Sequence, residues 1–384
     1  MYSVAILVET ANAYSRGIVQ GISSYIFENG PWNICYEERA LDSPAPNWLK
    51  SWHGDGIIVR SSNPKLARLA LQTGAQVVDL GENRIAGVPT IFPDYAACSR
   101  LAADHLKERE FRHFAYLGIA GRNFSQKRLS AFESYLRCAE TVTTLELPQQ
   151  EFTNSPFQEN HALNDWLKGL PKPCGLMVCY DLLGIYVIQA CLASSLRVPE
   201  DIAVVGVNND EIQCLMSPIP LSSVAQDTLR AGREAAALLE RLMNGVPAPQ
   251  KPQIVPPLYV VARQSTDTMA IQDSLVKSAL ALIRQQSCQG ITVGKIVEDL
   301  SVSRRLLERR FSLALNRSIH DEIRRVQMTR ALELLKGSAL TLDAIARRVG
   351  FSAASHFSIA FRHFYHQRPG EVREKARKGN LDAE

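Results

Sequence analysis

The sequence predicts a two-lobed α/β domain with parallel sheets, followed by an all-α domain with two helix-turn-helix units. Up to about residue 265, short continuous apolar runs alternate with amphipathic stretches, a pattern typical of parallel strands covered by helices. Beyond about residue 273 the strand-like runs stop, and helical periodicity rich in arginine takes over. Within that second region a pattern of helix, tight turn and helix occurs twice.

The apolar runs of the first region are the expected strands, and the amphipathic stretches between them are the expected helices. The strands are predicted at Val4–Val8, Ile34–Tyr36, Gly56–Val59, Gln76–Leu80, His113–Leu117, Leu176–Cys179 and Ala203–Val207. The helices include Arg16–Phe27, Cys98–Lys107, Leu129–Cys138, Leu183–Ala193 and Leu229–Leu242. Since about 265 residues is generous for one sheet, we expect two lobes with a cleft between them. Ligands of such sheets bind where loops leave the carboxyl ends of strands.

Proline and glycine mark the end of this region. The prolines of residues 245–249 and 255–257 break the helical pattern, and the stretch from Arg263 to Asp273 has the composition of a linker. We therefore expect a first domain over residues 1–265, a linker over 266–273 and a second domain over 274–384.

The net charge of +4 conceals an asymmetry between these domains. From Ala270 onward there are 20 basic and 12 acidic residues, a net +8, whereas the preceding part has 23 basic and 27 acidic residues, a net −4. A basic domain attached to a mildly acidic body suggests a polyanion as partner of that domain alone. A solvated basic helix surface would produce the same charge, and charge alone does not separate the two.

Composition argues for a globular protein of the cytoplasm. Hydrophobic residues make up 46% of the chain and charged residues 21%, which is ordinary for a folded domain. No run of about 18 apolar residues predicts a membrane span, and the first residues lack the basic region of a signal peptide. The eight cysteines are scattered without a CxxC pair, so we expect reduced, apolar side chains and neither a zinc site nor any other cofactor.

The internal repeat defines the second domain. Ile291–Ser303 corresponds to Leu340–Ser352 at an offset of 49, whereas Leu307 and Phe311 correspond to Phe357 and Phe361 at an offset of 50, so the second copy has one inserted residue. Thr292 and Thr341 are suitable N-caps for the first helix of each unit, and Ser303 and Ser352 for the second. Gly350 suits the turn between the helices of the second unit.

The second helix of each unit divides into an apolar and a polar face, as a helix that reads a DNA groove requires. The expected buried stripes are Leu306, Leu307, Phe311 and Leu315 in the first unit, and Phe357, Phe361 and Phe364 in the second. The candidate DNA-binding residues are Ser303, Arg304, Arg305, Glu308 and Arg309, and then Ala354, Ser355, His356, Ser358 and Arg362. Arginine pairs with guanine edges, and serine or histidine can reach bases or phosphates. A helical domain that binds a partner protein is the alternative.

A helical stretch from Ile319 to Lys336 connects the two units. About 18 residues at 1.5 Å each span roughly 27 Å. A stiff connector of that length could hold two recognition helices close to one DNA turn apart, roughly 34 Å. We therefore expect one monomer to contact two successive major grooves of double-stranded DNA.

Residues 275 to about 375 resemble the DNA-binding domain of the AraC/XylS family. The resemblance rests on Ile345-Ala346-x-x-x-Gly350-Phe351, Phe357-Ser358-x-x-Phe361 and Pro369-x-x-x-Arg373. The chain departs from the pattern at Asn316 and His366, where glycine is usual after each recognition helix, and both types tolerate the left-handed backbone. Gln327 stands where arginine is usual in the linking helix, which puts one salt bridge or phosphate contact of that helix in doubt.

The first domain resembles the periplasmic-binding-protein-like sensor of LacI-type regulators. Pro93-Asp94-Tyr95, Tyr180-Asp181, residues 205–210 and Ser222-Ser223-Val224-Ala225-Gln226 carry the likeness. The resemblance implies a sugar in the inter-lobe cleft, a homodimer and, through the tail, a promoter at which RNA polymerase is a possible partner. Paired with the AraC-type tail it favours a pentose such as xylose. The candidate ligand-binding residues on loops at strand ends are Thr10, Tyr14, Arg16, Arg128, Asp181, Asn208, Asn209 and Gln226. An acidic residue is usual at the position of Asn208, so the sugar bound can differ.

Other classes of protein remain as alternatives. The first domain could process a carbohydrate as an enzyme, or respond to a different metabolite or to a partner protein. The first strand is followed by Glu9-Thr10-Ala11-Asn12-Ala13-Tyr14 without glycine, and the chain has no P-loop and no G-x-S-x-G elbow, so nucleotide-binding and hydrolase signatures are missing. A sugar-binding transport receptor would carry an export signal and would not carry a basic helical tail, so both features argue against that class. His363 and His366 lack the spacing and acidic partner of a helical zinc site.

Overall fold

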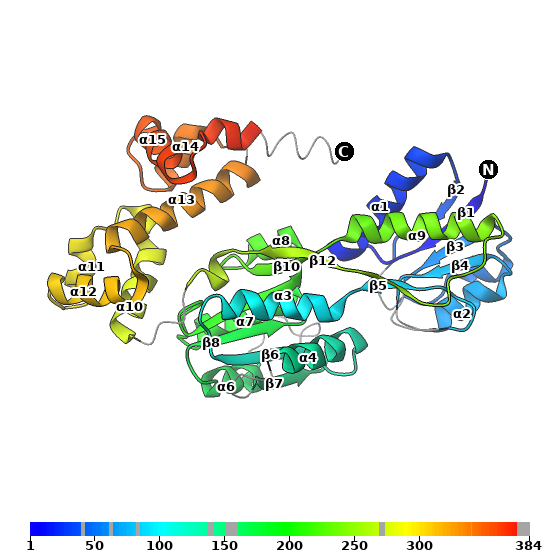
Figure 1. Ribbon diagram of the computed structural model, residues 1–384, viewed down its shortest axis with the longest axis horizontal. Coiled ribbons are helices and arrows are strands. Elements are labelled where there is room, and N and C mark those ends of the chain that lie inside the picture. The colour runs from blue at the N-terminus through cyan, green and yellow to red at the C-terminus, as the bar shows by residue number, and fades with distance from the viewer. Residues whose placement is uncertain are drawn as a thin grey trace. The chain divides into compact units, whose positions relative to one another are not determined.

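The computed structural model describes residues 1–39, 43–60, 64–81, 85–136, 142–149, 160–268, 273–338 and 340–374. Its contacts divide the chain into two compact units, Met1–Thr268 and Met269–Glu384, hereafter unit 1 and unit 2 (Figure 1). Unit 1 is the predicted α/β domain with parallel sheets, and unit 2 is all-helical, which confirms the predicted fold class.

The first lobe of unit 1 is built on a parallel four-stranded sheet in the order β2-β1-β3-β4. Its elements are β1 (Ser3–Leu7), α1 (Ala13–Asn29), β2 (Asn33–Tyr36), η1 (Asn47–Ser51), β3 (Gly56–Val59), α2 (Pro64–Gln72) and β4 (Gln76–Asp79). β1 and β3 are almost completely buried, which explains their unbroken apolar sequences. Asn12 starts α1 by accepting a hydrogen bond from the Ser15 backbone N–H at 2.8 Å.

The second lobe is built on a six-stranded sheet in the order β12-β10-β9-β8-β6-β7, parallel except for β12. Its strands are β6 (His113–Ile119), β7 (Val142–Leu147), β8 (Cys174–Val178), β9 (Ile202–Asn208), β10 (Ser222–Gln226) and β12 (Pro257–Val261). Its helices are α3 (Tyr95–Lys107), α4 (Asn123–Tyr135), α6 (His161–Gly169), α7 (Asp181–Ala193), α8 (Glu211–Met216) and the short η2 (Gln264–Thr266).

The chain passes between the lobes more than once. α9 (Thr228–Met243) follows β10 of the second lobe but packs on α1 and contributes to the core of the first lobe (Figure 1). β5 (Ile91–Pro93), which leads into α3, pairs in parallel with β11 (Gln253–Val255), which leads into β12. These crossings bring strand ends from both lobes together, where the sequence places its polar side chains.

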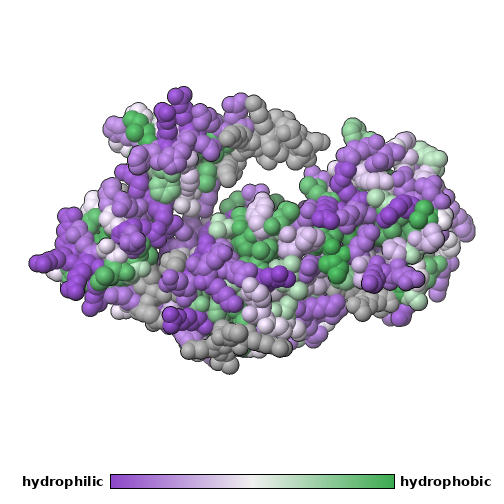
Figure 2. Space-filling model, viewed as in Figure 1, coloured by the Kyte–Doolittle hydropathy of each residue, from purple (hydrophilic) through white to green (hydrophobic). Residues whose placement is uncertain are grey.

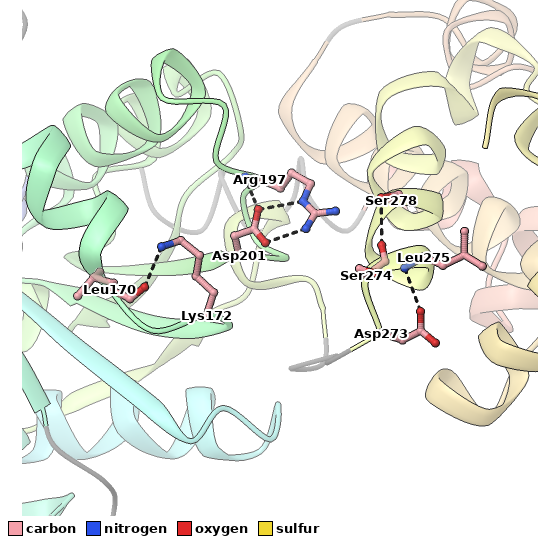
Figure 3. Close-up of polar contacts among 8 residues, drawn as sticks. All are labelled: Leu170, Lys172, Arg197, Asp201, Asp273, Ser274, Leu275 and Ser278. Carbon is pink, nitrogen blue, oxygen red and sulfur yellow. Dashed lines mark hydrogen bonds and ion pairs between the residues drawn. The ribbon is translucent and has the colours of Figure 1, made fainter. Parts of the chain in front are cut away.

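Unit 2 consists of helices joined by short turns. They are α10 (Ser274–Gln286), η3 (Ser287–Gln289), α11 (Val293–Asp299), α12 (Arg304–Leu315), α13 (Ile319–Gly337), α14 (Leu342–Arg348) and α15 (Ala354–Tyr365). Asp273 caps α10 by accepting from the Leu275 N–H at 2.9 Å (Figure 3). One apolar cluster unites α10, α11, α12 and the start of α13, and a second unites the rest of α13 with α14 and α15.

The predicted strands are all present, with ends displaced by at most two residues. Three strands of the large sheet were missed: β7 mixes in Thr143, Thr144 and Glu146, β10 begins with two serines, and β12 lies in the region read as proline-broken. α4 begins at Asn123, six residues before the predicted start, so Arg128 lies within the helix rather than at its beginning.

The first domain extends further along the chain than the predicted end at residue 265. Arg263 is buried and η2 packs on β9 and β10, so residues 263–268 belong to unit 1. Asp273 begins unit 2 as the cap of α10, and residues 269–272 lie outside the described residues.

The described cysteines form no disulfide bond, and most are buried, as predicted for apolar side chains. Cys138 lies outside the described residues. In the described part of the chain, no helix has the length and apolarity needed to cross a bilayer. Nor does that part bring three or more candidate metal ligands together.

Candidate functional site

The loops that follow the strands of unit 1 bring its polar candidates together. Tyr14 follows β1, Asp181 follows β8, Asn208 ends β9 and is followed by Asn209, and Gln226 ends β10. Arg128 comes from α4. Carboxyl ends of parallel strands meet at one edge of a sheet, so these side chains have the placement of ligand-binding groups in open α/β folds.

Arg128 is the most distinctive of them because it is a cation that is only 3% exposed. Its guanidinium carbon lies 5.4 Å from the ring centre of Tyr95 and 5.5 Å from that of Phe124. One terminal nitrogen donates to the carbonyl of Cys179, whereas Nε has no hydrogen-bond partner among the described residues. A buried donor without a partner costs free energy, so this N–H is suited to an acceptor oxygen of a ligand.

A second arginine, Arg60, lies directly after β3 and was not among the predicted site residues. Its guanidinium carbon is 4.9 Å from the ring centre of Tyr14, its Nη1 donates to Ser15 Oγ at 3.0 Å, and it forms an ion pair with buried Glu9. Burial lowers the pKa of Arg60 to about 10. Burial, with Tyr95 nearby, raises the pKa of the Tyr14 hydroxyl, which stays protonated and can donate. The position of Arg60 at the end of a buried strand could have identified it.

Asp181 organises the neighbouring turn. Its carboxylate accepts from Ser223 Oγ at 2.5 Å and from the Asp210 backbone N–H at 2.7 Å. Burial raises the pKa of Asp181 to about 7, against the opposing effect of the two hydrogen bonds. Asp210 in turn accepts from the Ala13 N–H at 3.4 Å, which joins the second lobe to the loop after β1.

Asn208, Asn209 and Gln226 complete this edge of the sheet. Asn208 and Asn209 have φ values of 105° and 52°, backbone conformations that asparagine tolerates better than most residues. The Asn209 side-chain oxygen accepts from Arg263 at 2.8 Å, and Gln226 donates to Cys98 Sγ at 2.9 Å. Asn208 is half-buried, and no hydrogen bond of its side chain to another described residue is present.

The two remaining candidates, Thr10 and Arg16, lie elsewhere on the loop after β1. Both line an open groove together with Ala11, Val19, Tyr36, Glu38 and Arg39. Arg16 is exposed and donates to the Thr10 carbonyl at 2.9 Å. The predicted ligand residues therefore divide into a buried or half-buried group at the strand ends, which includes Arg128, and the pair Thr10 and Arg16 in this groove.

In unit 2 the helix boundaries follow the predicted repeat. Thr292 and Thr341 cap α11 and α14 through their side chains, and Ser303 caps α12 by accepting from the Leu306 N–H at 3.3 Å. The predicted cap at Ser352 is wrong: α15 starts after Ala353, because the extra residue of the second copy falls in the turn that precedes it.

The exposed face of α12 carries most of the predicted DNA-binding residues of the first unit. Arg305 and Arg309 are exposed and make no hydrogen bond or ion pair with any described residue, whereas Arg304 pairs with Glu308 at 2.8 Å. Leu307 and Phe311 are buried as predicted, but Leu306 is 40% exposed, so its assignment to the buried stripe is wrong. Leu306 lies about 100° around the helix axis from Leu307, which is buried, so the side chain of Leu306 falls at the border of the exposed face.

The corresponding face of α15 is polar and less charged. Ser355, His356 and Arg362 are exposed, and Ala354 and Ser358 are half-buried. Phe357 and Phe361 are buried, but Phe364 is 38% exposed, which corrects its prediction as a core residue. Of the two histidines considered above, His363 lies on the helix, and His366 ends it in the left-handed conformation with φ 56°.

The connecting helix α13 has no bend-inducing proline or glycine before its last residue and joins the two clusters. Gln327 is buried in it and donates to the Ser287 carbonyl at 2.9 Å, so this departure from the family pattern serves packing within the domain. Glu322 is buried between Arg317 and Arg325 at 2.9 and 2.7 Å. The face of unit 2 visible in Figure 2 is mainly hydrophilic.

An α/β unit with polar groups at its strand ends, joined to two helix-turn-helix units with exposed arginines, defines a class of protein: a transcription regulator with a small-molecule sensor domain. Family models agree: the XylR N-terminal domain matches residues 3–97, a periplasmic binding protein-like domain matches 103–266, and a helix-turn-helix domain matches 296–375.

The comparison with single proteins is more specific. The chain is 31% identical to the xylose operon regulatory protein of Haemophilus influenzae, over 97% of this chain and 98% of that protein. It is 29% identical to the protein of the same name from Escherichia coli, with 97% of each covered. A solved structure of the xylose-binding transcription activator XylR superposes with a TM-score of 0.82 at 27% identity, covering 97% of this chain and 98% of that one. The chain belongs to the family of xylose operon regulatory proteins, which are named as regulators and not as enzymes.

Proposed function

We propose that a small sugar bound at the strand ends of unit 1 controls the binding of unit 2 to promoter DNA, with a pentose such as xylose as the first candidate. The observation that carries this proposal is the buried Arg128 guanidinium, whose Nε lacks a partner among the described residues and whose plane lies near aromatic rings. A sugar offers both hydroxyl oxygens for such a donor and apolar C–H faces for such rings.

The neighbouring groups fit the same ligand. Tyr14 and Asn208 supply hydroxyl and amide groups, and Asp181 and Asn209 hold the turn that positions Asn208. Thr10, Arg16 and Gln226 remain proposed ligand contacts on the same loops. The names of the relatives support xylose as the first sugar to test.

The DNA-binding part of the proposal places α12 and α15 in successive major grooves. Contacts would come from Ser303, Arg304, Arg305, Glu308 and Arg309 of the first unit and from Ala354, Ser355, His356, Ser358 and Arg362 of the second. A homodimer of the chain, acting in the cytoplasm at a promoter where it can meet RNA polymerase, follows from the family resemblance. Light scattering with and without sugar measures the oligomeric state directly.

A thermal-shift panel of pentoses and hexoses tests the sugar. A ligand at a hundredfold its Kd stabilises the folded state by roughly 2.7 kcal/mol, which is easily detected. We expect one pentose to raise the Tm of the full chain and hexoses to do so less. A flat response to every sugar would remove the sugar from the proposal and leave the DNA-binding part standing.

Two variants locate the site. Arg128→Lys keeps a cation but loses the planar donor, so we expect a sugar Kd at least tenfold weaker, while Arg112→Gln, an exposed arginine of the same lobe, serves as the matched control. Asp181→Ala releases the Asn208–Asp210 turn and is expected to abolish the sugar response while DNA binding persists. An unchanged sugar dose response in both variants would place the ligand elsewhere.

A further inference from the structure

The recognition helix of the second helix-turn-helix unit, α15, carries an exposed apolar side chain. The candidate DNA contacts named above do not include it. Ile359 lies in the middle of α15 and is 70% exposed, whereas Phe357 and Phe361 on the opposite side of the helix are buried. Single exposed apolar residues are common on protein surfaces, so exposure alone assigns nothing. The position of Ile359 on the helix carries the argument.

Ile359 is surrounded by the polar residues of the candidate DNA face. On a helix, residues three and four positions apart are neighbours. Ser355 and His356 therefore precede Ile359 on its own face, and Arg362 and His363 follow it, all of them exposed. Ile359 is thus at the centre of the face that the proposed function directs into the major groove.

The register between the two recognition helices places Ile359 a second time. α12 and α15 have 12 residues each, and their caps correspond at an offset of 50: Ser303 with Ala353, and Asn316 with His366. At that offset Ile359 corresponds to Arg309, an exposed arginine of the first unit that makes no hydrogen bond or ion pair with a described residue. One position of the repeat therefore presents a guanidinium in one helix and a branched hydrocarbon in the other.

The chemistry of the major groove distinguishes these two side chains. Of the four bases, only thymine exposes an apolar group there, its 5-methyl, and guanine offers the two acceptors that arginine binds. An isoleucine side chain has no donor or acceptor and would cover the polar edge of any other base without a hydrogen bond. We propose that Ile359 contacts the 5-methyl group of a thymine in the half-site bound by α15. This assignment rests on the proposed DNA-binding function.

Replacing thymine by uracil removes the methyl group and tests the contact. An operator is first selected from random duplexes with the full-length chain, and each thymine of that operator is then replaced singly by deoxyuridine. We expect at least one position at which the wild-type chain binds the uracil duplex roughly fourfold more weakly, the effect of exposing one buried carbon group. At that position Ile359→Ala should bind the thymine and uracil duplexes equally, because the partner of the methyl group is gone.

Two further variants complete the test. Ile212→Ala removes an exposed isoleucine of unit 1 and should keep the wild-type uracil penalty. Ile359→Arg places in α15 the residue of α12 and should enrich guanine at the same position on reselection. A uracil penalty of the same size in Ile359→Ala and wild type, or no penalty at any thymine, would overturn the assignment while leaving DNA recognition intact. Failure to select any sequence would overturn the DNA-binding function itself, and the assignment with it.

Discussion

The two helix-turn-helix units share a scaffold and differ in the surface they present. Both begin with a capping threonine, both have a second helix of 12 residues, and both end that helix in the left-handed conformation. The exposed face of α12 carries four arginines, Arg304, Arg305, Arg309 and Arg310, whereas that of α15 carries Arg362 among serine, histidine and isoleucine. The positions that repeat thus maintain the fold. The exposed positions that do not repeat give α12 a charged face and α15 a nearly neutral one.

The interiors differ as well. The core of the first helix-turn-helix unit consists mainly of aliphatic residues around Phe311. The second contains a row of rings, with centroids 5.7 Å apart for Phe351 and Phe357, 5.6 Å for Phe357 and Phe361, and 4.8 Å for Phe361 and Tyr365. Aromatic pairs at such distances add to the stability that burial alone provides.

The largest expected effect comes from truncating these cores. Phe361→Ala should destabilise the second helix-turn-helix unit by about 3–5 kcal/mol. Phe311→Ala should destabilise the first helix-turn-helix unit by somewhat less, because Phe311 lacks ring partners in the described core. Hydrogen exchange of backbone amides measures each unit separately in the full chain. If Phe361→Ala lowered protection equally in α12 and α15, the two cores would be one cooperative unit and the comparison would fail.

The next effect concerns the charged face. Arg305→Ala is expected to weaken binding to a selected operator by about 1–3 kcal/mol and binding to a scrambled duplex by less, because a base contact carries discrimination. Ser355→Ala at the corresponding position of α15 should cost less. Fluorescence anisotropy at several salt concentrations provides the measurement. An equal loss on both duplexes, with the salt slope reduced by about one, would make Arg305 a phosphate contact instead.

A smaller effect is expected at the junction between the two helix-turn-helix units. Gln327 hydrogen-bonds to the Ser287 carbonyl at 2.9 Å, and a Cβ atom added to Gly350 would lie 3.0 Å from Gln327 Nε2. Gln327→Ala removes the shorter of two hydrogen bonds to the buried Ser287 carbonyl, which the Gly290 backbone N–H also reaches at 3.4 Å. It should cost about 1 kcal/mol of stability, with weaker binding to operators of the selected half-site spacing. Gln327→Met, which keeps the volume, separates packing from hydrogen bonding. If both variants bound operators of altered spacing as wild type does, Gln327 would have no role in setting the distance between the helices.

Sequence patterns predicted what depends on local regularity. Buried strands, capping threonines and the offset between the repeats follow from periodicity and side-chain chemistry over a few residues, and the structure confirms them. What the sequence missed depends on distant neighbours. Arg60 joins the candidate site by its contacts with Tyr14 and Glu9, and buried Arg263 hydrogen-bonds to Leu221 and Asn209. The N-cap at Ala353 was missed because the inserted residue could be placed at several positions of the turn.

The smallest expected effect tests how closely the two helix ends match. Asn316 and His366 occupy left-handed positions with φ of 51° and 56°, where glycine has no steric cost. Asparagine tolerates this region through its short polar side chain, and histidine less so, so His366→Gly should stabilise its unit by up to about 1 kcal/mol and Asn316→Gly by less. Hydrogen exchange at the ends of α15 and α12 resolves the difference. Because both residues are exposed, equal gains would show that backbone conformation alone sets the cost, and a loss in His366→Gly would mean that the imidazole makes a stabilising contact.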